Sequence, residues 1–377
     1  MATQNSQSTA FLSTGVDGLD NVLNGGLTRD RLYLVEGDPG AGKTTMAIQF
    51  LIEGARLGEP VLYITLSENE VELRSIAASH GWSMDGIVIH EAIPNENILD
   101  PKEQYTLFHP SEVEIGGTMH EILATIERVR PTRVVLDSLS ELQLLAGNAL
   151  HYRRQVLAYK QFLAKRSCTA LLLDNRSASD MDLQVRSIAH GVISLDQRTM
   201  EYGTEQRRIR VTKYRGIAFR GGLHDYTVTT GGLRVFPRLV ASDTRNQRVP
   251  EQFRSGLPEL DALLGGGLET GSSTLFAGPP GAGKSTLASL FVSAALKSNL
   301  RAAMFLFEES ASNLLNRSEA LNMDLGGALA TGQLLLKQVD PAEMSPGEFS
   351  HAVCAAADGG AKVIVIDSLN GYLNAMP

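Results

Sequence analysis

A glycine-rich motif, G-x-x-x-x-G-K-[ST], occurs twice in this chain, over residues 37–44 and again over residues 278–285. In each copy an apolar run precedes the motif and a helical pattern follows it. Glycines at this spacing let several backbone N–H groups turn inward around a phosphate oxygen, and the lysine reaches the terminal phosphates. The chain is therefore constrained to contain two strand–loop–helix units, each with a loop suited to a nucleoside triphosphate.

We expect both loops to hold the phosphates, with Mg²⁺ bound by the hydroxyl that ends the motif, on Thr44 and Ser285. The positive end of the helix after each loop points at the same anion. Two ordinary glycine turns are the alternative. The expected nucleotide-binding residues are Gly37, Asp38, Pro39, Gly40, Ala41, Gly42, Lys43, Thr44, Thr45, Gly278, Pro279, Pro280, Gly281, Ala282, Gly283, Lys284, Ser285 and Thr286.

The motif belongs to a longer repeat. At the spacing between the two motif lysines, and without a gap, Asp20 aligns with Asp261 and the tripeptide Gly-Gly-Leu at 25–27 aligns with the one at 266–268. About half of the positions in 15–45 are identical to their partners. A repeat of this length indicates a duplicated domain rather than a solenoid, and a length of 377 residues fits two or three domains.

The repeat predicts a flexible tail over residues 1–12, a first domain over 13–237, a linker over 238–254 and a second domain over 255–377. The second copy has roughly half the length of the first and ends just after a buried-strand pattern. We therefore expect an incomplete second domain, truncated after its carboxylate-bearing strand, in a piece of a longer protein. A natural half-domain is the alternative, although it would leave a sheet edge unpaired.

Continuous apolar strands alternate with helices, which predicts an α/β fold with a mainly parallel, twisted sheet covered by helices on both faces. Residues 90–117 contain three prolines and a Gly-Gly pair and are interpreted as a long loop. Short strands joined by Gly-Gly turns predict a C-terminal antiparallel extension of the first domain. Its strands are expected over 193–195, 208–213, 226–229 and 233–236. The other expected strands cover 32–36, 60–65, 133–137 and 169–174, and the expected helices 44–57, 70–80, 119–130 and 152–166.

Composition argues against several classes of protein. The formal net charge is −8 and there is no polybasic run, so nucleic acid is not an expected partner. The arginines at 207–210 are interpreted as a solvated strand edge. Cys168 and Cys354 lie in different copies and have no metal or redox spacing. A polar N-terminus and the lack of a long apolar run predict a cytoplasmic protein with no membrane contact.

Hydrolysis of a γ-phosphate requires a carboxylate near Mg²⁺ and a group that orients the attacking water. Asp137 and Asp367 each end an apolar strand and are each followed by Ser-Leu. We expect both to support the metal beside Thr44 and Ser285. A helix N-cap is the alternative role for each aspartate.

Paired glutamates provide the candidate water-orienting group. Glu308 and Glu309 follow the second strand of copy two, and the repeat aligns Ser67 and Glu68 with them. One acid of such a pair could polarise water while the other positions its neighbours, and their repulsion can raise one pKa. Two solvated glutamates at a helix start are the alternative. In copy one only Glu68 is left.

Lys213 and Arg215 share one face of a strand because side chains alternate along it. Two cations on one face are able to grip an anion, and across a subunit boundary they would act like arginine fingers on a neighbour's nucleotide. A solvated pair is the alternative.

These features resemble the tandem-domain KaiC-type ATPases of the RecA superfamily. The resemblance rests on the doubled T/S-G-x-x-x-L-D…G-G-L start, both loops and both Asp-Ser-Leu segments. It rests also on Phe-Glu-Glu-Ser at 307–310, Lys-x-Arg-Gly at 213–216 and Val-Thr-Thr-Gly-Gly-Leu-Arg-Val-Phe-Pro at 228–237, and it covers nearly the whole chain from Ser13.

The resemblance implies P-loop NTPase domains in hexameric rings, with ATP and Mg²⁺ between subunits. It implies that Glu68, Glu308 and Glu309 are catalytic, the first glutamate of a pair being the water-activating base. Lys213 and Arg215 would reach the γ-phosphate of the neighbouring subunit. In clock members of the family, the second domain also phosphorylates its own serine and threonine, so a serine/threonine autokinase is expected in the full-length second domain only.

Two departures from the family pattern matter. Ser67 stands where the first domain's water-activating glutamate is expected, so that domain hydrolyses slowly, uses Glu68, or mainly binds ATP to hold a ring. The region of the autophosphorylation sites and of a second Lys-x-Arg lies beyond Pro377. We expect an ATP-hydrolysing, ring-forming switch protein in signalling or timing. The alternatives are a DNA-dependent ATPase of RecA or RadA type and a nucleotide-sensing interaction module with little turnover.

Overall fold

The computed structural model describes residues 11–92, 110–146, 149–176, 180–200, 203–240 and 251–375. The chain divides into two compact units, one made of residues 1–199 and 205–238 and the other of residues 200–204 and 239–377. Of the segments expected to be irregular, residues 1–10, 93–109 and 241–250 lie outside the described residues. Within the described residues, no helix is long and apolar enough to cross a membrane.

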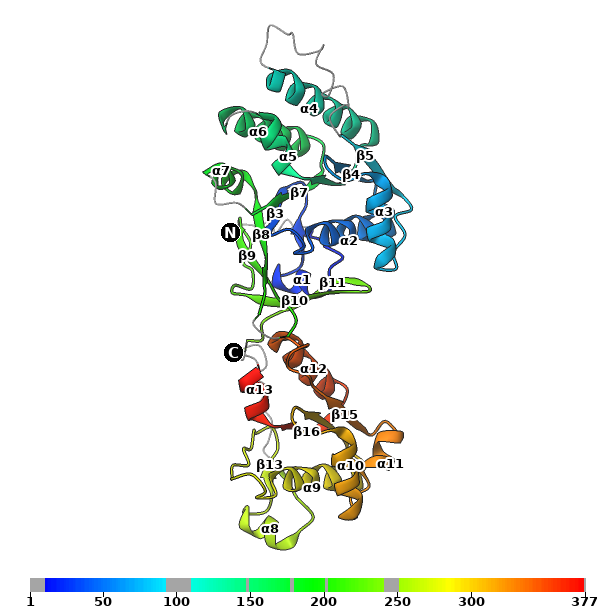
Figure 1. The fold of residues 1–377 in the computed structure, drawn as a ribbon, viewed down its shortest axis with the longest axis vertical. Coiled ribbons are helices and arrows are strands. Elements are labelled where there is room, and N and C mark those ends of the chain that lie inside the picture. The colour runs from blue at the N-terminus through cyan, green and yellow to red at the C-terminus, as the bar shows by residue number, and fades with distance from the viewer. Residues whose placement is uncertain are drawn as a thin grey trace, which may run out of the picture. The chain divides into compact units, whose positions relative to one another are not determined.

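The first unit is built on one large sheet (Figure 1), for which the described residues give the strand order β11-β10-β9-β8-β3-β7-β6-β4-β5. From β5 to β8 the strands run parallel, and β9, β10 and β11 continue the sheet in antiparallel fashion. The strands are β3 (Leu32–Gly37), β4 (Val61–Thr65), β5 (Ile87–Glu91), β6 (Arg133–Asp137), β7 (Thr169–Asn175), β8 (Gly191–Arg198), β9 (Gln206–Tyr214), β10 (His224–Thr229) and β11 (Gly232–Phe236).

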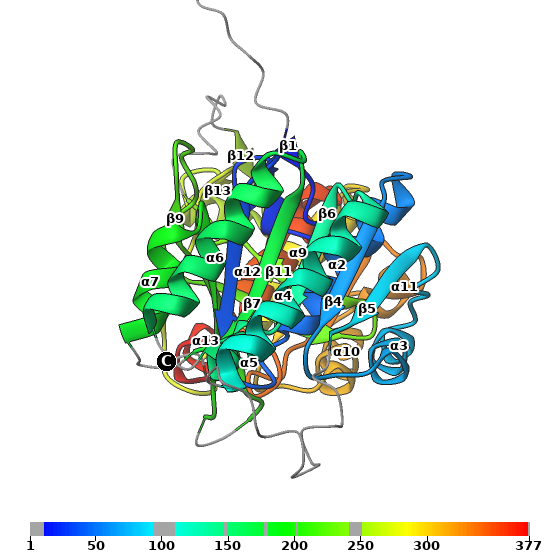
Figure 2. The same cartoon turned by 90° about the horizontal axis from the view of Figure 1, so that it is seen from above.

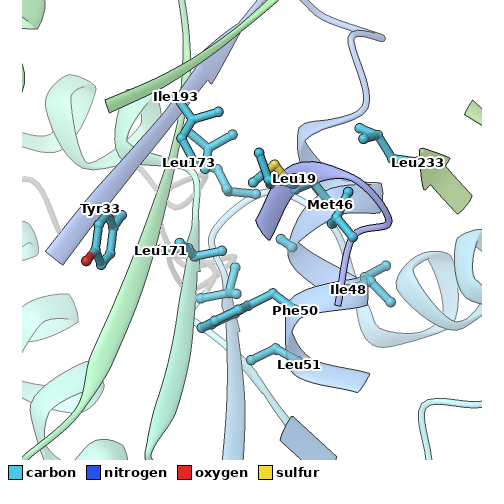
Figure 3. Packing of buried hydrophobic residues seen from close by; sticks show 14 of the residues in the cluster. Leu19, Tyr33, Met46, Ile48, Phe50, Leu51, Leu171, Leu173, Ile193 and Leu233 are labelled. Carbon is cyan, nitrogen blue, oxygen red and sulfur yellow. The ribbon is translucent and has the colours of Figure 1, made fainter. Parts of the chain in front are cut away.

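Helices cover both faces of this sheet. In its buried strands the side chains that point to either face are apolar, so both faces need a covering layer. The face of Val35 packs with α2 (Lys43–Arg56) and α3 (Glu70–Ser79), and the face of Leu34 packs with α4 (Pro110–Val129), α5 (Leu139–Ala146) and α6 (Ala149–Ala164). Figure 2 shows α4, α5 and α6 lying over the strands. In Figure 3, Met46, Ile48, Phe50 and Leu51 of α2 pack with residues of β7 and β8.

A small antiparallel strand pair precedes the glycine-rich loop in each unit. In the first unit β1 (Phe11–Leu12) pairs with β2 (Leu27–Thr28), flanking α1 (Leu19–Val22). In the second unit β12 (Gln252–Phe253) pairs with β13 (Leu268–Glu269), flanking α8 (Pro258–Leu263). The aligned aspartates fix both turns, since Asp20 accepts from the amide of Thr14 at 2.9 Å and Asp261 from that of Ser255 at 2.7 Å.

The second unit contains a parallel sheet of order β15-β14-β16 among its described residues. Its elements are β14 (Arg301–Leu306), β15 (Leu334–Gln338), β16 (Ala361–Asp367), α9 (Lys284–Lys297), α10 (Ala311–Ala320), α11 (Leu325–Ala330), α12 (Pro346–Asp358) and α13 (Leu369–Ala375). Residues 273–278 align with β3 but form no strand. In the first unit β3 pairs with β7 and β8, and the described part of the second unit has no strands at those places.

The predicted fold class is confirmed, and several details are corrected. Residues 110–117, expected in a loop, belong to α4, where Pro110 occupies the first turn and its missing N–H is tolerated. Strand β8, expected to be antiparallel, also runs parallel to β3. Phe11–Leu12 and Gln252–Phe253, expected in the tail and the linker, are strands. Helices α5 and α7 (Asp180–Ile188) were not predicted, because helices of eight and nine residues are too short to give a clear periodicity.

Candidate active site

The first loop links β3 to α2 at the carboxyl end of the sheet's parallel strands. Gly40 and Gly42 have φ of 80° and 96°, in the left-handed region that L-residues rarely adopt. Gly42 is the N-cap of α2 and brings no side chain to it, so the first amides of the helix stay free to face an anion. The loop geometry therefore suits a phosphate.

Lys43 holds its charged head inside the loop. Its Nζ donates to the carbonyl oxygens of Gly37 at 2.8 Å and Asp38 at 2.9 Å. Burial lowers the pKa of Lys43, while the negative charges of Asp137, Asp174 and Asp38 oppose this shift. The site thus places an ammonium group among carboxylates and backbone carbonyls at the mouth of the loop.

Two residues predicted to support a metal come together beside this lysine. Thr44 Oγ1 donates to Asp137 Oδ2 at 3.2 Å, and the Tyr63 hydroxyl donates to the same oxygen at 2.6 Å. Burial raises the pKa of Asp137, against the hydrogen bonds from Tyr63 and Thr44 and the charge of Lys43. A hydroxyl and one carboxylate are oxygen ligands that suit Mg²⁺.

No group of three or more His, Cys, Asp or Glu side chains able to hold a metal occurs among the described residues. Mg²⁺ commonly relies on one or two carboxylates together with substrate phosphates and water. The pair Thr44 and Asp137 therefore fits a metal that arrives with a nucleotide, rather than a metal held by the protein alone.

The antiparallel extension braces the first loop from outside. Arg207 Nη1 donates to the carbonyl oxygen of Gly40 at 3.1 Å, and the Tyr226 hydroxyl donates to that of Ala41 at 2.6 Å. Sequence reasoning missed both residues and interpreted Arg207 as part of a solvated edge. Both partners lie more than 160 positions away in the chain, so no local pattern signals these contacts.

Glu68 lies three residues after Thr65, the last residue of β4. Its Oε2 is buried and has no hydrogen-bond partner among the described residues. Burial raises the pKa of Glu68, and the charges of Asp137 and Glu72 raise it further. The carboxyl group therefore lies within electrostatic reach of the aspartate that bonds Thr44.

The second loop repeats the lysine geometry of the first. Lys284 Nζ donates to the carbonyl oxygens of Gly278 and Pro279, both at 2.9 Å, and Gly281 and Gly283 have φ of 79° and 86°. A cavity of about 1260 Å³ in the second unit is lined by Lys284, Asp367 and residues 274–278, among others. Within the described residues, Asp367 Oδ2 is buried without a hydrogen-bond partner.

The two glutamates of the second site have different partners. Glu308 Oε1 accepts from Ser368 Oγ at 2.9 Å. Glu309 is held by Arg317 through two hydrogen bonds, of 2.5 Å from Nη1 and 2.8 Å from Nη2. The pair is thus not two equivalent solvated acids.

Lys213 and Arg215 both reach the C-terminal end of α7. Lys213 Nζ donates to the carbonyl oxygens of Arg186 at 2.6 Å and Ser187 at 3.0 Å, and an Arg215 Nη2 donates to Ser187 at 2.8 Å. Burial lowers the pKa of Lys213, and Arg215 and Lys160 lower it further. Arg215 follows the last residue of β9, and both cations are hydrogen-bonded to carbonyl oxygens at the negative end of α7.

Comparison with known proteins adds a family to this geometry. A family model described as "ATPase: KaiC" matches residues 12–240 and 253–376. The circadian clock protein KaiC2 of Synechocystis sp. is 30% identical over 331 residues, which cover 86% of this chain and 57% of that protein.

The circadian clock oscillator protein KaiC of Parasynechococcus marenigrum is 27% identical over 95% of this chain and 70% of its own length. That of Synechococcus elongatus is 27% identical over 84% of this chain and 62% of its own length. The matches therefore span 57% to 70% of the length of these relatives.

Proposed function

This chain belongs to the KaiC family of ATPases, and on that premise we propose that it binds ATP with Mg²⁺ at both loops and hydrolyses it. The observation that carries the proposal is the hydrogen bond between Thr44 and Asp137 beside the loop-bound Lys43. It joins the loop hydroxyl to the strand-end carboxylate, the two groups that a magnesium–nucleotide complex requires side by side.

The residues of the first site have distinct roles in this proposal. Loop amides and Lys43 bind the phosphates, and Thr44 and Asp137 hold the metal. Mg²⁺ supplies charge neutralisation on the β- and γ-phosphates. Tyr63 keeps the carboxylate of Asp137 oriented through its 2.6 Å hydrogen bond. Lys284, Ser285 and Asp367 take the corresponding roles in the second site.

We further propose that the protein forms hexameric rings in the cytoplasm with ATP between subunits. Lys213 and Arg215 would then meet the γ-phosphate of the neighbouring subunit's nucleotide. Their attachment to α7 supports this role, because it holds the two cations in a fixed position. The relatives' names connect them to the circadian clock, and a switch in timing or signalling is the role we propose here.

Autophosphorylation on serine and threonine by the full-length second domain is part of the same proposal. It is tested with the natural protein and ATP labelled on the γ-phosphate. Label that stays on the protein, and is lost in Lys284→Ala, supports the autokinase. Label released only as inorganic phosphate would contradict it and leave an ATPase.

A second candidate function is favoured by Ser67, which replaces a glutamate in the first site. In that case the first unit would bind ATP tightly with little turnover and serve to hold the ring together. Tight binding to the first site without phosphate release would support this nucleotide-sensing role.

Lys43→Ala tests nucleotide binding at the first site directly. A charge-assisted hydrogen bond contributes about 1.5–3 kcal/mol, so we expect ATP affinity at that site to fall roughly ten- to a hundredfold. ATP-dependent assembly, followed by light scattering, should weaken as well. Lys165→Ala, which removes an exposed lysine elsewhere in the unit, is the control. Unchanged affinity and assembly in Lys43→Ala would refute the proposal.

A further inference from the structure

We propose that the two sites use different glutamates to orient the attacking water, Glu68 in the first and Glu308 in the second. The position that decides this lies in the following helix, where the first unit has Ile76 and the second has Arg317. The inference rests on the proposed ATP hydrolysis and assigns the water-orienting carboxylate of each site.

The two regions correspond residue by residue. Helices α3 and α10 are both ten residues long, and they start at aligned positions of the repeat. Asn69 and Ser310 are their aligned N-caps, and each accepts a hydrogen bond from the third residue of its helix. The alignment therefore pairs Ser67 with Glu308, Glu68 with Glu309, and Ile76 with Arg317.

In the second site, Arg317 binds the carboxylate of Glu309, the second glutamate of the pair. Its guanidinium binds both carboxylate oxygens of Glu309, at 2.5 and 2.8 Å, in the bidentate geometry that makes such pairs strong and directional. Glu308 instead bonds Ser368, the residue directly after Asp367. Glu308 is thus the acid on the side of the candidate metal ligand.

The first site has Ile76 in place of the arginine, so this position offers no guanidinium to Glu68, the glutamate aligned with Glu309. Ile76 is partly buried and packs against the core around α2. It has no group that could bind a carboxylate. Glu68 Oε2 accordingly is buried and without a partner among the described residues, while Asp137 lies close enough to raise the pKa of Glu68.

A second difference fixes Glu68 from its backbone. Thr65 Oγ1 donates to the carbonyl oxygen of Glu68 at 2.7 Å and accepts from its amide at 3.0 Å. The aligned residue in the second unit is Leu306, which lacks a hydroxyl. In the first site, Glu68 is therefore held through its main chain, and its Oε2 has no hydrogen-bond partner among the described residues. In the second site, Glu309 is held through its side chain by Arg317.

A buried carboxylate oxygen without a partner is a position that a water molecule satisfies by donating a hydrogen bond. The oxygen of that water bonds to the γ-phosphorus while the bond from phosphorus to the β–γ bridging oxygen breaks. ADP leaves, inorganic phosphate forms, and the remaining proton passes to solvent. The loss of the first-position glutamate at Ser67 is then offset by the absence of the arginine at Ile76.

The first test uses the natural protein with Lys284→Ala, so that turnover reports on the first site. Glu68→Gln should lower phosphate release about a hundredfold or more, with ATP affinity unchanged. Ile76→Arg should lower it too, by capturing Glu68. Controls are Ile76→Leu and Glu70→Gln, which changes a half-buried acid two residues from Glu68. Thermal unfolding checks that each variant is folded.

Turnover that persists in Glu68→Gln but is lost in Lys43→Ala would overturn the inference while leaving the ATPase in place. No turnover in the Lys284→Ala protein itself would overturn both the inference and hydrolysis at the first site. ATP binding, measured separately with a fluorescent analogue, tells that case from a failure to bind nucleotide.

The reciprocal test uses Lys43→Ala, so that turnover reports on the second site. Glu308→Gln should cost about a hundredfold, and Glu309→Gln much less. Adding Arg317→Ile to Glu308→Gln should restore at least tenfold of the lost rate, because Glu309 is then released as Glu68 is. A purely structural role for Arg317 predicts a further loss, which would refute the assignment.

Discussion

The surroundings of His190 disfavour the charged form of its side chain. Its ring makes edge contacts with Tyr33 and Tyr214, with ring centroids 5.8 Å apart in both cases. Its Nε2 is buried and has no hydrogen-bond partner among the described residues. Burial lowers the pKa of His190 to about 4, and Arg31, Arg215, Lys160 and Lys213 add to the shift.

This environment predicts a pH dependence of folding. Below about pH 6.5 the unfolded chain takes up a proton at His190, whereas the folded protein does so only near pH 4. The free energy of unfolding should therefore fall as the pH drops through this window. His190→Phe, which keeps an aromatic ring, should reduce the fall in melting temperature between pH 7 and pH 5. Equal slopes in both proteins would contradict the prediction.

The residues that chemistry demands could be predicted from sequence, and those that hold them could not. Lys43, Thr44 and Asp137 follow from the motif and from the end of an apolar strand. Tyr63, Arg207 and Arg317 do not, because each acts on a partner that only the folded sheet or helix brings near it. In the sequence, Tyr63 is indistinguishable from the apolar residues around it in β4.

At the scale of elements, α3 is stabilised at its N-terminus by a capping box. Asn69 Oδ1 accepts from the amide of Glu72 at 2.9 Å, and Glu72 Oε2 accepts from the amide of Asn69 at 3.0 Å. Glu70 and Glu72 also place negative charge at the positive end of the helix. The cap fixes the turn that carries Glu68 into the site.

Asn69→Ala should lower the free energy of unfolding of the first unit by about 1 kcal/mol, because the amide of Glu72 at the helix start loses its partner. Asn69→Ser, which keeps an accepting oxygen, should cost only a few tenths of that. Chemical denaturation of the two variants side by side measures the difference. Equal losses would mean that the side-chain cap contributes little.

Elements were predictable where their residues are continuously apolar, as in β3, β4, β6 and β7. They were missed where the surroundings decide. Helix α5 begins two residues after the candidate metal aspartate, and its packing against α4, α6 and β7, rather than its periodicity, specifies it. The direction of β8 depends on two neighbours at once, which a linear pattern does not record.

At the scale of the whole molecule, the first unit has its own core on both faces of its sheet. The two clusters of buried side chains contain residues between Leu12 and Val235 alone. A segment that buries its apolar surface within itself meets the main condition for folding independently.

Residues 11–238 produced alone should therefore unfold in one cooperative transition. ATP with Mg²⁺ at a hundred times the dissociation constant should stabilise the fragment by about 2.7 kcal/mol, and Lys43→Ala should reduce this gain to about 0.4–1.4 kcal/mol. Calorimetry with and without nucleotide measures both. A broad transition without nucleotide response would show that the unit depends on the rest of the chain.

The segments that precede the two loops also differ in how they are hydrogen-bonded. Strand β3 is hydrogen-bonded on one side to β7 and on the other to β8, whereas residues 273–278 join no sheet. Amide hydrogens in β3 should therefore exchange with deuterated solvent only when the first unit opens as a whole, and those of 273–278 within the shortest labelling times. The nucleotide proposed for the first loop would meet a rigid cradle, and the one proposed for the second would have to order residues 273–278 as it binds.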